Sequence, residues 1–73
     1  MTKVTIYMRL IDEDLEVYRP VQAMVMSKNV YKILDEDYDP DVEQWEFIPG
    51  MLVCCKNKKT SDGDILLASE LVS

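Results

Sequence analysis

The chain has 73 residues, enough for one small domain near the lower limit at which a single hydrophobic core suffices, so we expect residues 1–73 to form one domain without a cofactor. Its formal net charge of −6, from 14 acidic and 8 basic residues, opposes binding to phosphate backbones and argues against a nucleic-acid partner. No apolar run approaches the ~20 residues that cross a bilayer, and no signal-peptide core is visible, so the sequence predicts a cytoplasmic protein without membrane contact.

The N-terminal half alternates apolar and polar side chains with a period of two, which is typical of strands. In a first predicted strand one face carries Val4, Ile6, Met8 and Leu10. In a second, residues 15–26, one face carries Leu15, Val17, Val21, Ala23 and Val25. Because Pro20 lacks an N–H, we expect this second strand to be an edge or to be bent by a bulge at Pro20. Residues 30–34 form a third strand, paired with the second as a hairpin, with Tyr31 and Ile33 on one face.

The C-terminal half begins with an acidic loop, residues 35–43, which carries six of the fourteen acidic residues. In the segment EQWEFIPGMLVCC, residues 43–55, Trp45 and Phe47 share one face of a predicted strand, and a Pro-Gly turn leads into a buried strand with Val53 and Cys55 on one face. These features predict a β-hairpin. Residues 57–63 follow as a second polar loop.

The last segment, residues 64–72, allows two interpretations. Leu66 and Ala68 alternate as in a strand, whereas Asp64 could cap a short helix that buries Leu67 and Leu71; we favour the strand. Together the elements predict an all-β fold, a small antiparallel SH3-like barrel of five to six strands. The alternative is an α+β open sheet with a short C-terminal helix.

Four stretches of the chain together resemble a family of small uncharacterised bacterial proteins: VYRPVQA (17–23), YKIL (31–34), EQWEFIPGMLVCC (43–55) and GDILLASEL (63–71). The family pattern is similar to VWRPVxA, YxIL, an acidic loop and WEFxPGxxVxC, and the resemblance spans nearly the whole chain. It implies an SH3-like barrel with no assigned activity and no catalytic residues. Tyr18 stands where the pattern has a Trp, which puts in doubt any pocket that depends on an indole there.

Residue types bearing on catalysis are scarce. The chain has no histidine, so no Ser/His or Cys/His pair can activate a nucleophile, and solvated loop carboxylates lack the contrasting environments that acid–base catalysis needs. We therefore predict that the protein is not an enzyme. The adjacent Cys54 and Cys55 point to opposite faces of a strand, where a mutual disulfide is strained, so we expect reduced, structural thiols with one inward.

Charged side chains give one metal hypothesis. Asp35, Asp37 and Asp39 stand at positions 1, 3 and 5 of a twelve-residue calcium loop, with Glu46 at position 12. Position 6 requires glycine but is Pro40, which excludes an EF-hand and leaves only weak calcium binding by the acidic loop. We interpret Lys56, Lys58 and Lys59 as a solvated loop patch, and we expect Arg19 to pair with an acidic neighbour across the sheet.

An interaction surface is the function that remains after these exclusions. Tyr18, Gln22, Met24 and Met26 lie opposite the presumed core face of the second strand, unless a bend at Pro20 reverses the register and turns Met24 and Met26 inward. Trp45 is either core or half-exposed beside Tyr38, in a groove walled by Pro40 and Pro49 that would suit a proline-rich peptide. The predicted contact residues are Tyr18, Met24, Met26, Tyr38 and Trp45.

We accordingly predict a small protein-interaction module for a protein or peptide partner, either a monomer or a homodimer formed through the second strand. One alternative is an acidic decoy, in which residues 35–46 occupy a basic partner as an inhibitor or immunity protein does. The other is weak calcium binding.

Overall fold

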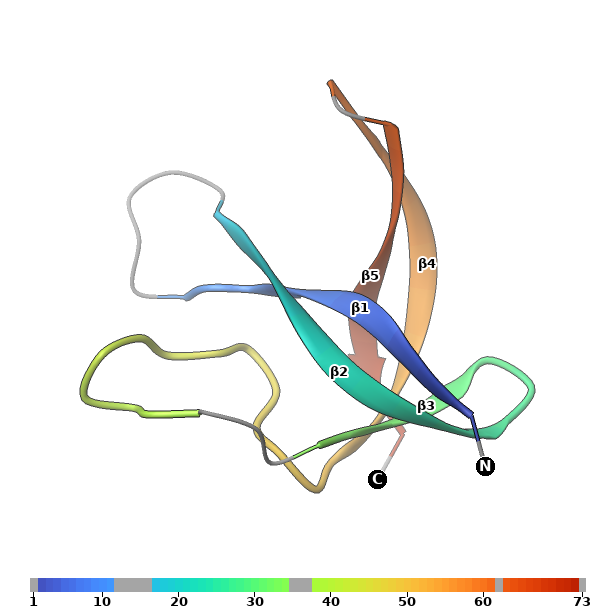
Figure 1. Cartoon of the computed structure of the whole chain (residues 1–73), viewed down its shortest axis with the longest axis horizontal. Helices are drawn as coiled ribbons and strands as arrows, with labels where there is room; N and C mark the ends of the chain where they lie inside the picture. Colours follow the sequence, from blue (N-terminus) through green and yellow to red (C-terminus); the bar gives the residue numbers. More distant parts are fainter. Residues whose placement is uncertain (1, 12–16, 35–37, 62, 73) are drawn as a thin grey trace.

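The computed structural model describes residues 2–11, 17–34, 38–61 and 63–72. Five strands follow one another in chain order around a closed barrel (Figure 1). They are β1 (Lys3–Arg9), β2 (Tyr18–Ser27), β3 (Val30–Ile33), β4 (Leu52–Thr60) and β5 (Gly63–Leu71). The prediction of a small all-β, SH3-like barrel is confirmed, and the C-terminal segment is a strand. Among the described residues, no helix is long and apolar enough to span a membrane.

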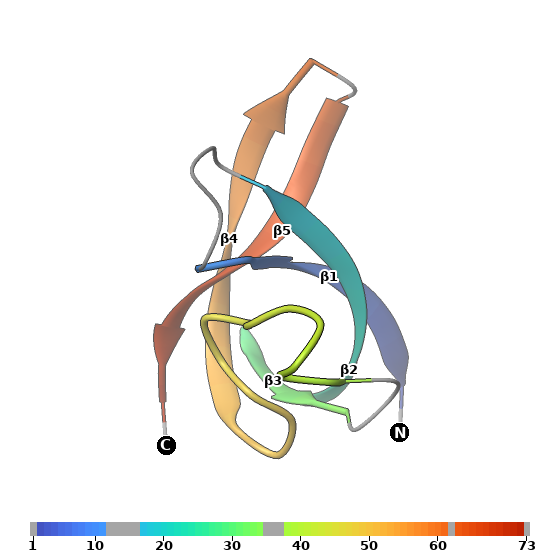
Figure 2. The same ribbon diagram turned by 90° about the vertical axis from the view of Figure 1, so that its left-hand side faces the viewer.

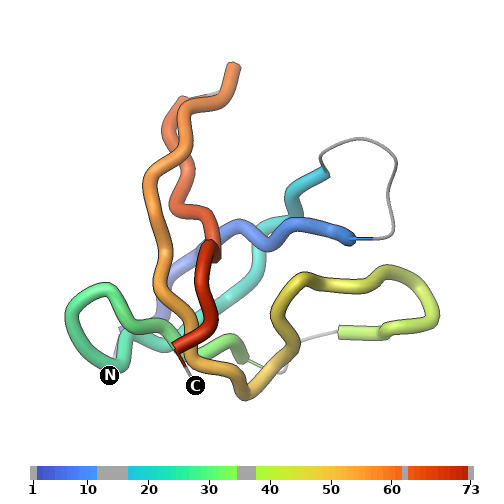
Figure 3. Tube along the Cα trace, turned by 180° about the vertical axis from the view of Figure 1, so that it is seen from behind, coloured from blue at the N-terminus to red at the C-terminus, as the bar shows by residue number. Residues whose placement is uncertain are grey.

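The barrel closes where its first and last strands meet. Consecutive strands are antiparallel, and because their number is odd, β1 and β5 run in the same direction and pair in parallel, at Tyr7 and Leu67. The sheet is therefore antiparallel except at its closing pair. The start of β1 and the end of β5 both lie at the end of the molecule opposite the β4–β5 turn (Figure 3).

The far halves of β4 and β5 project from the barrel as a two-stranded arm, residues 56–61 and 63–66 (Figure 1). The two strands pair as far as Thr60 and Gly63, whereas β4 pairs with the described part of β3 only at Leu52 and Val53. The predicted loop over 57–63 is therefore wrong, since β4 continues to Thr60. The sequence there is polar on both faces of the strand, so no apolar alternation was present to reveal it.

Alternating side chains of the strands fill the barrel. The buried cluster consists of Ile6, Met8, Leu10, Val21, Ala23, Ile33, Trp45, Val53, Cys55 and Ala68. The inward faces predicted for β1, β3 and β4 are confirmed. Val17 is 38% exposed and does not join this core, and Leu15 lies outside the described residues.

Pro20 neither bends β2 nor makes it an edge strand. The pairing of β2 with β1 runs without a register shift from Tyr18 opposite Arg9 to Met24 opposite Lys3, with Pro20 opposite Tyr7. The Gln22 backbone carbonyl accepts a hydrogen bond from the Leu34 N–H (3.1 Å), on the β3 side of β2. Because the backbone polar groups of residues two apart point to the same side of a strand, the Pro20 nitrogen also points to the β3 side. It lies beyond the last β3 pair, Ala23–Ile33, where no ladder donor is required. The shift in β2 comes later, between Val25 and Ser27.

Residues 44–51 do not form the predicted β-hairpin. Trp45 instead makes an isolated antiparallel bridge with Leu10, beyond the end of β1, supported by bonds from the Ile11 N–H to the Gln44 carbonyl (3.0 Å) and from the Glu46 N–H to the Arg9 carbonyl (3.0 Å). The Pro-Gly turn bonds to β3, through the Gly50 N–H and the Ile33 carbonyl (2.7 Å). The alternation in burial is nevertheless as predicted, since Glu46 is exposed between Trp45 and Phe47.

Core packing gives the first prediction. Ile33 is fully buried, so Ile33→Ala should lower the free energy of unfolding by about 2–5 kcal/mol through lost burial and a cavity. Ile48→Ala removes the same atoms from a residue that is 44% exposed and should cost less than about 1 kcal/mol. Urea unfolding followed by circular dichroism measures both, and equal losses would contradict this assignment of the core.

Candidate functional site

The structure distributes the five predicted contact residues over three places. Tyr18 begins β2, and Met24 and Met26 lie near its other end. Six residues of extended strand separate Tyr18 from Met24, a distance of roughly 20 Å. Tyr38 and Trp45 belong to the segment between β3 and β4. The five residues therefore do not line one groove.

The pair Met24 and Met26 belongs to an outer face that crosses β2, β3 and β4. Strand pairing sets Met24 beside Lys32, and Lys32 beside Leu52, and the Val72 N–H donates to the Leu52 carbonyl (2.7 Å). The intervening residues of these strands enter the core, so this row points away from it. We call Met24, Met26, Lys32, Leu52 and Val72 the β2–β4 outer face.

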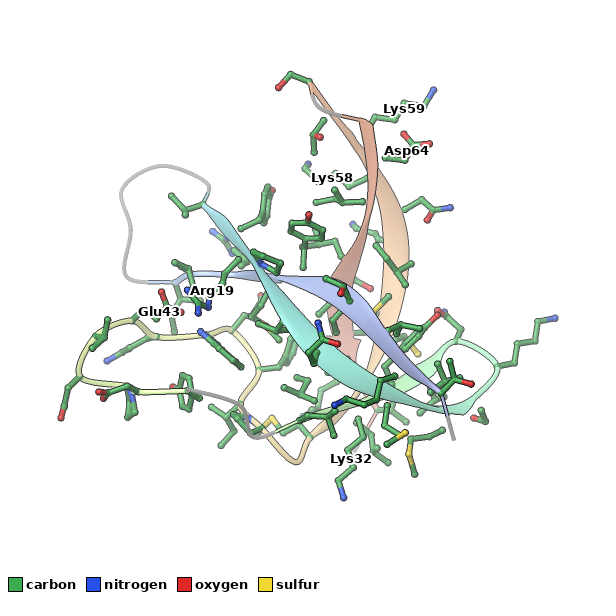
Figure 4. The ribbon with its side chains drawn as sticks, in the orientation of Figure 1. Arg19, Lys32, Glu43, Lys58, Lys59 and Asp64 are labelled. Atoms are coloured by element: carbon green, nitrogen blue, oxygen red, sulfur yellow. The ribbon has the colours of Figure 1, made fainter. Side chains whose placement is uncertain are left out.

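Burial across the β2–β4 outer face is partial. Met24 and Leu52 are half-buried, while Met26 is 43% and Val72 48% exposed. Lys32 is exposed and points away from the barrel in Figure 4. The β1–β2 register, unbroken as far as Met24, and the exposure of Met26 overturn the alternative in which Met24 and Met26 turn inward. Flexible methionines on an apolar surface suit contact with another protein.

Trp45 is a core residue. It is 3% exposed, its indole N–H donates to Glu43 Oε1 (2.8 Å), and the Tyr38 ring packs against it at 4.6 Å between centroids and 50° between planes. Residues 38–46 lie across the end of the barrel (Figure 2). Of the two predicted interpretations, the structure shows the core and not a groove that exposes the indole.

Glu43 also bonds the loop to β2. The same carboxylate oxygen lies 3.0 Å from Arg19 Nε, and the two side chains face each other in Figure 4. Arg19 therefore pairs with an acidic residue as expected, but this residue lies in the segment between β3 and β4 and not across the sheet. One carboxylate thus satisfies a buried indole N–H and a guanidinium together.

This arrangement predicts unequal effects of removing its two charged members. Glu43→Ala leaves the indole N–H without its acceptor and should lower the free energy of unfolding by about 1–3 kcal/mol. Arg19→Ala removes a side chain that is 45% exposed and should cost at most about 1 kcal/mol. Glu43→Gln keeps an acceptor and should fall between them. Chemical denaturation monitored by Trp45 fluorescence measures the three free energies of unfolding. A larger loss for Arg19→Ala than for Glu43→Ala would contradict the prediction.

The calcium hypothesis depends on residues that are only partly described, because Asp35 and Asp37 lie outside the described residues. Asp39 Oδ1 accepts the Asp41 N–H (3.0 Å), and Glu46 Oε2 lies 4.0 Å from Arg9 Nη1. Within the described ranges, no group of three or more His, Cys, Asp or Glu side chains could hold a metal ion. Weak calcium binding by the acidic loop stays a prediction.

The two cysteines are free thiols with different surroundings. Cys55 is in the core, where desolvation, and secondarily the neighbouring Cys54, raises its pKa to about 11. Cys54 is half-buried on the outer side of β4. The predicted arrangement of reduced thiols with one inward is confirmed.

Thiol labelling should distinguish the two positions. At pH 8 one equivalent of a disulfide reagent should react with the native protein, at Cys54, and a second only after unfolding, because the raised pKa keeps Cys55 protonated and its burial excludes the reagent. In Cys54→Ser the native protein should react slowly. Rapid labelling of that variant would contradict the assignment.

The raised pKa of Cys55 also makes the stability of the fold depend on pH. Because the folded-state pKa is raised, the stability due to protonated Cys55 is complete below pH 9 and is lost as the pH rises toward 11.

No protein-family model, curated protein or solved structure matches the chain. The family resemblance of the sequence therefore stays an expectation. Sequence reasoning found Met24 and Met26 but missed Leu52 and Val72, which join them only through the pairing of β3 with β4 and the backbone contact beyond it. The opposite parity of Leu52 to Val53 and Cys55 was the one local signal of its outward position.

Proposed function

We propose that the chain is a small, non-enzymatic interaction module that binds a partner protein through the β2–β4 outer face. The observation that carries this proposal is the row Met24–Lys32–Leu52–Val72, which is apolar except for one lysine and faces away from the core. The lack of histidine supports a role in binding over one in catalysis. We place this module in the cytoplasm, without nucleic acid or membrane as a partner.

Charge favours a partner of a different kind over a second copy. β2 has β1 on one side and β3 on the other, so a homodimer through this strand would use its outer side chains and not a backbone edge. Two such faces would both present Lys32 to the contact, and Lys3 lies opposite Met24 at its border. An apolar patch with an acidic rim on another protein complements this face better.

The acidic decoy is the second candidate. In the described part of the loop, Glu43 and Glu46 lie within ion-pair distance of Arg19 and Arg9, while Asp39 and Asp41 are exposed. Two of these four carboxylates are thus already partnered within the chain, which makes a row of unpaired negative charge a weaker basis for binding than the apolar face.

A pair of charge-matched variants tests the proposal. Met26→Glu places a carboxylate on the β2–β4 outer face, and Val42→Glu places one on an apolar residue that is 74% exposed in the acidic segment. Immobilised wild-type protein should retain a partner from a lysate of the encoding organism. Retention should fall at least about tenfold with Met26→Glu, as expected for a charge desolvated in an apolar contact, and persist with Val42→Glu.

Two further outcomes decide between the candidates. Retention that persists with Met26→Glu, rises with Val42→Glu and weakens steeply in salt would replace this proposal by the decoy, because the added carboxylate at position 42 strengthens attraction to a basic partner. Sedimentation velocity of the purified wild type and of Met26→Glu shows whether the partner is a second copy, in which case only the wild type sediments as a dimer.

A further inference from the structure

A pocket lies outside the barrel core, between the arm and the first two strands. Tyr7, Tyr18, Thr60 and Ile65 line a pocket of about 220 Å³ there. Tyr7 belongs to β1 and Tyr18 to β2, whereas Thr60 and Ile65 belong to the arm. The pocket therefore exists because the arm leaves the barrel and faces back toward β1 and β2 (Figure 1).

Strand register explains why these side chains meet. Tyr7 lies opposite Leu67 across the closing pair, and Leu67 lies opposite Lys56. Leu67 is only 8% exposed, although Leu66 and Ala68, its neighbours along the strand, are the residues that pack on the core. Leu67 is therefore buried on the face of β5 that points away from the core, so apolar packing also occurs on that face.

Positive charge borders the pocket. Lys58 Nζ lies 5.8 Å from the centroid of the Tyr18 ring, and Lys58 is paired with Ile65 across the arm. Figure 4 shows Lys58 on the side of the arm facing β2, and Lys59 and Asp64 on the other side. Lys59 and Asp64 are opposite each other in the ladder, so the nearest described carboxylate of the arm is on the wrong face to pair with Lys58.

The described residues around the pocket include a lysine and no carboxylate. The protein has a net charge of −6, yet among the described residues the pocket lining contains no carboxylate, and none of them forms an ion pair with Lys56 or Lys58. A cation over an aromatic ring beside an apolar wall can bind an apolar side chain and a carboxylate at neighbouring positions.

We propose that the Tyr7–Tyr18 pocket binds an acidic peptide segment. An aromatic or large aliphatic side chain of the segment enters between Tyr7 and Tyr18 against Ile65, and the adjacent Asp or Glu side chain pairs with Lys58. This site is separate from the β2–β4 outer face and does not depend on it. Phosphate ligands fit less well, because they bring no apolar side chain to fill the space between the two tyrosines.

The probe is an acetylated and amidated pentapeptide with a central phenylalanine flanked on each side by two glutamates. Titration into the ¹⁵N-labelled protein should shift the amide signals of Tyr7, Tyr18, Lys58 and Ile65, and leave those of Met26 and Val72 in place. Peptides with lysines in place of the glutamates, or with a central alanine, should bind at least about fivefold more weakly.

Two lysines on opposite faces of one strand supply the matched control. Lys58→Gln and Lys59→Gln remove the same charge at consecutive positions of β4, and thermal unfolding checks that both fold. Lys58→Gln should weaken binding of the acidic peptide about two- to fivefold, the value of one exposed charge pair, and Lys59→Gln should not. Equal losses in the two variants, no shifts at the pocket at millimolar peptide, or shifts reproduced by inorganic phosphate alone would each overturn the proposal.

Discussion

The fold depends on how a five-stranded meander closes. Four antiparallel steps, an even number, bring β1 and β5 together in the same direction, and in the described residues they pair at Tyr7 and Leu67. A closing pair this short lets β4 and β5 continue away from the barrel once they have passed it. The arm and the pocket beneath it both follow from that geometry, and Tyr7 serves as part of the closing pair and as a wall of the pocket.

The short strand β3 leaves one end of the barrel open, and other residues must cover it. β3 has four residues, too few to wall the whole barrel, and residues 38–46 cover the open end instead (Figure 2). Trp45 supplies the apolar surface, but a buried indole needs an acceptor for its N–H. Glu43, two residues earlier, provides it and binds Arg19 with the same oxygen. Side-chain hydrogen bonds and an ion pair thus fix this segment in place, whereas a regular strand would be fixed by backbone hydrogen bonds to its neighbours.

The sequence predicted the parts of this structure in which one face meets the core. Alternation identified the inward residues of β1, β3 and β4, because burial on one face imposes a period of two. It failed where that condition does not hold. Residues 57–60 are polar on both faces of the arm, and the Trp45–Phe47 alternation reflects packing across the barrel end, with one bridge to Leu10 in place of a ladder. The prediction that Pro20 bends β2 or makes it an edge strand was wrong for a related reason. A missing N–H disturbs a sheet only where a neighbouring strand would accept its hydrogen bond, and the local sequence does not show where β3 ends. The site was half predicted for a similar reason: Met24 is local to β2, whereas Leu52 joins it only through long-range register.

The positions of the charged side chains affect which partners the two proposed surfaces attract. The Arg19–Glu43 pair lies at one side, Lys58, Lys59 and Asp64 lie on the arm, and Lys32 lies at a third place (Figure 4). The molecule extends 33 Å along its longest axis, about three times the screening length of roughly 10 Å at 0.1 M salt. At that ionic strength the charges within a few ångströms of a surface decide what it attracts, and the net charge of −6 acts mainly on approach. Among the described carboxylates, Glu43 and Glu46 lie within ion-pair distance of arginines, and Asp64 lies on the other side of the arm from Lys58. A chain that is acidic overall can therefore present lysine-bordered apolar surfaces to acidic partners.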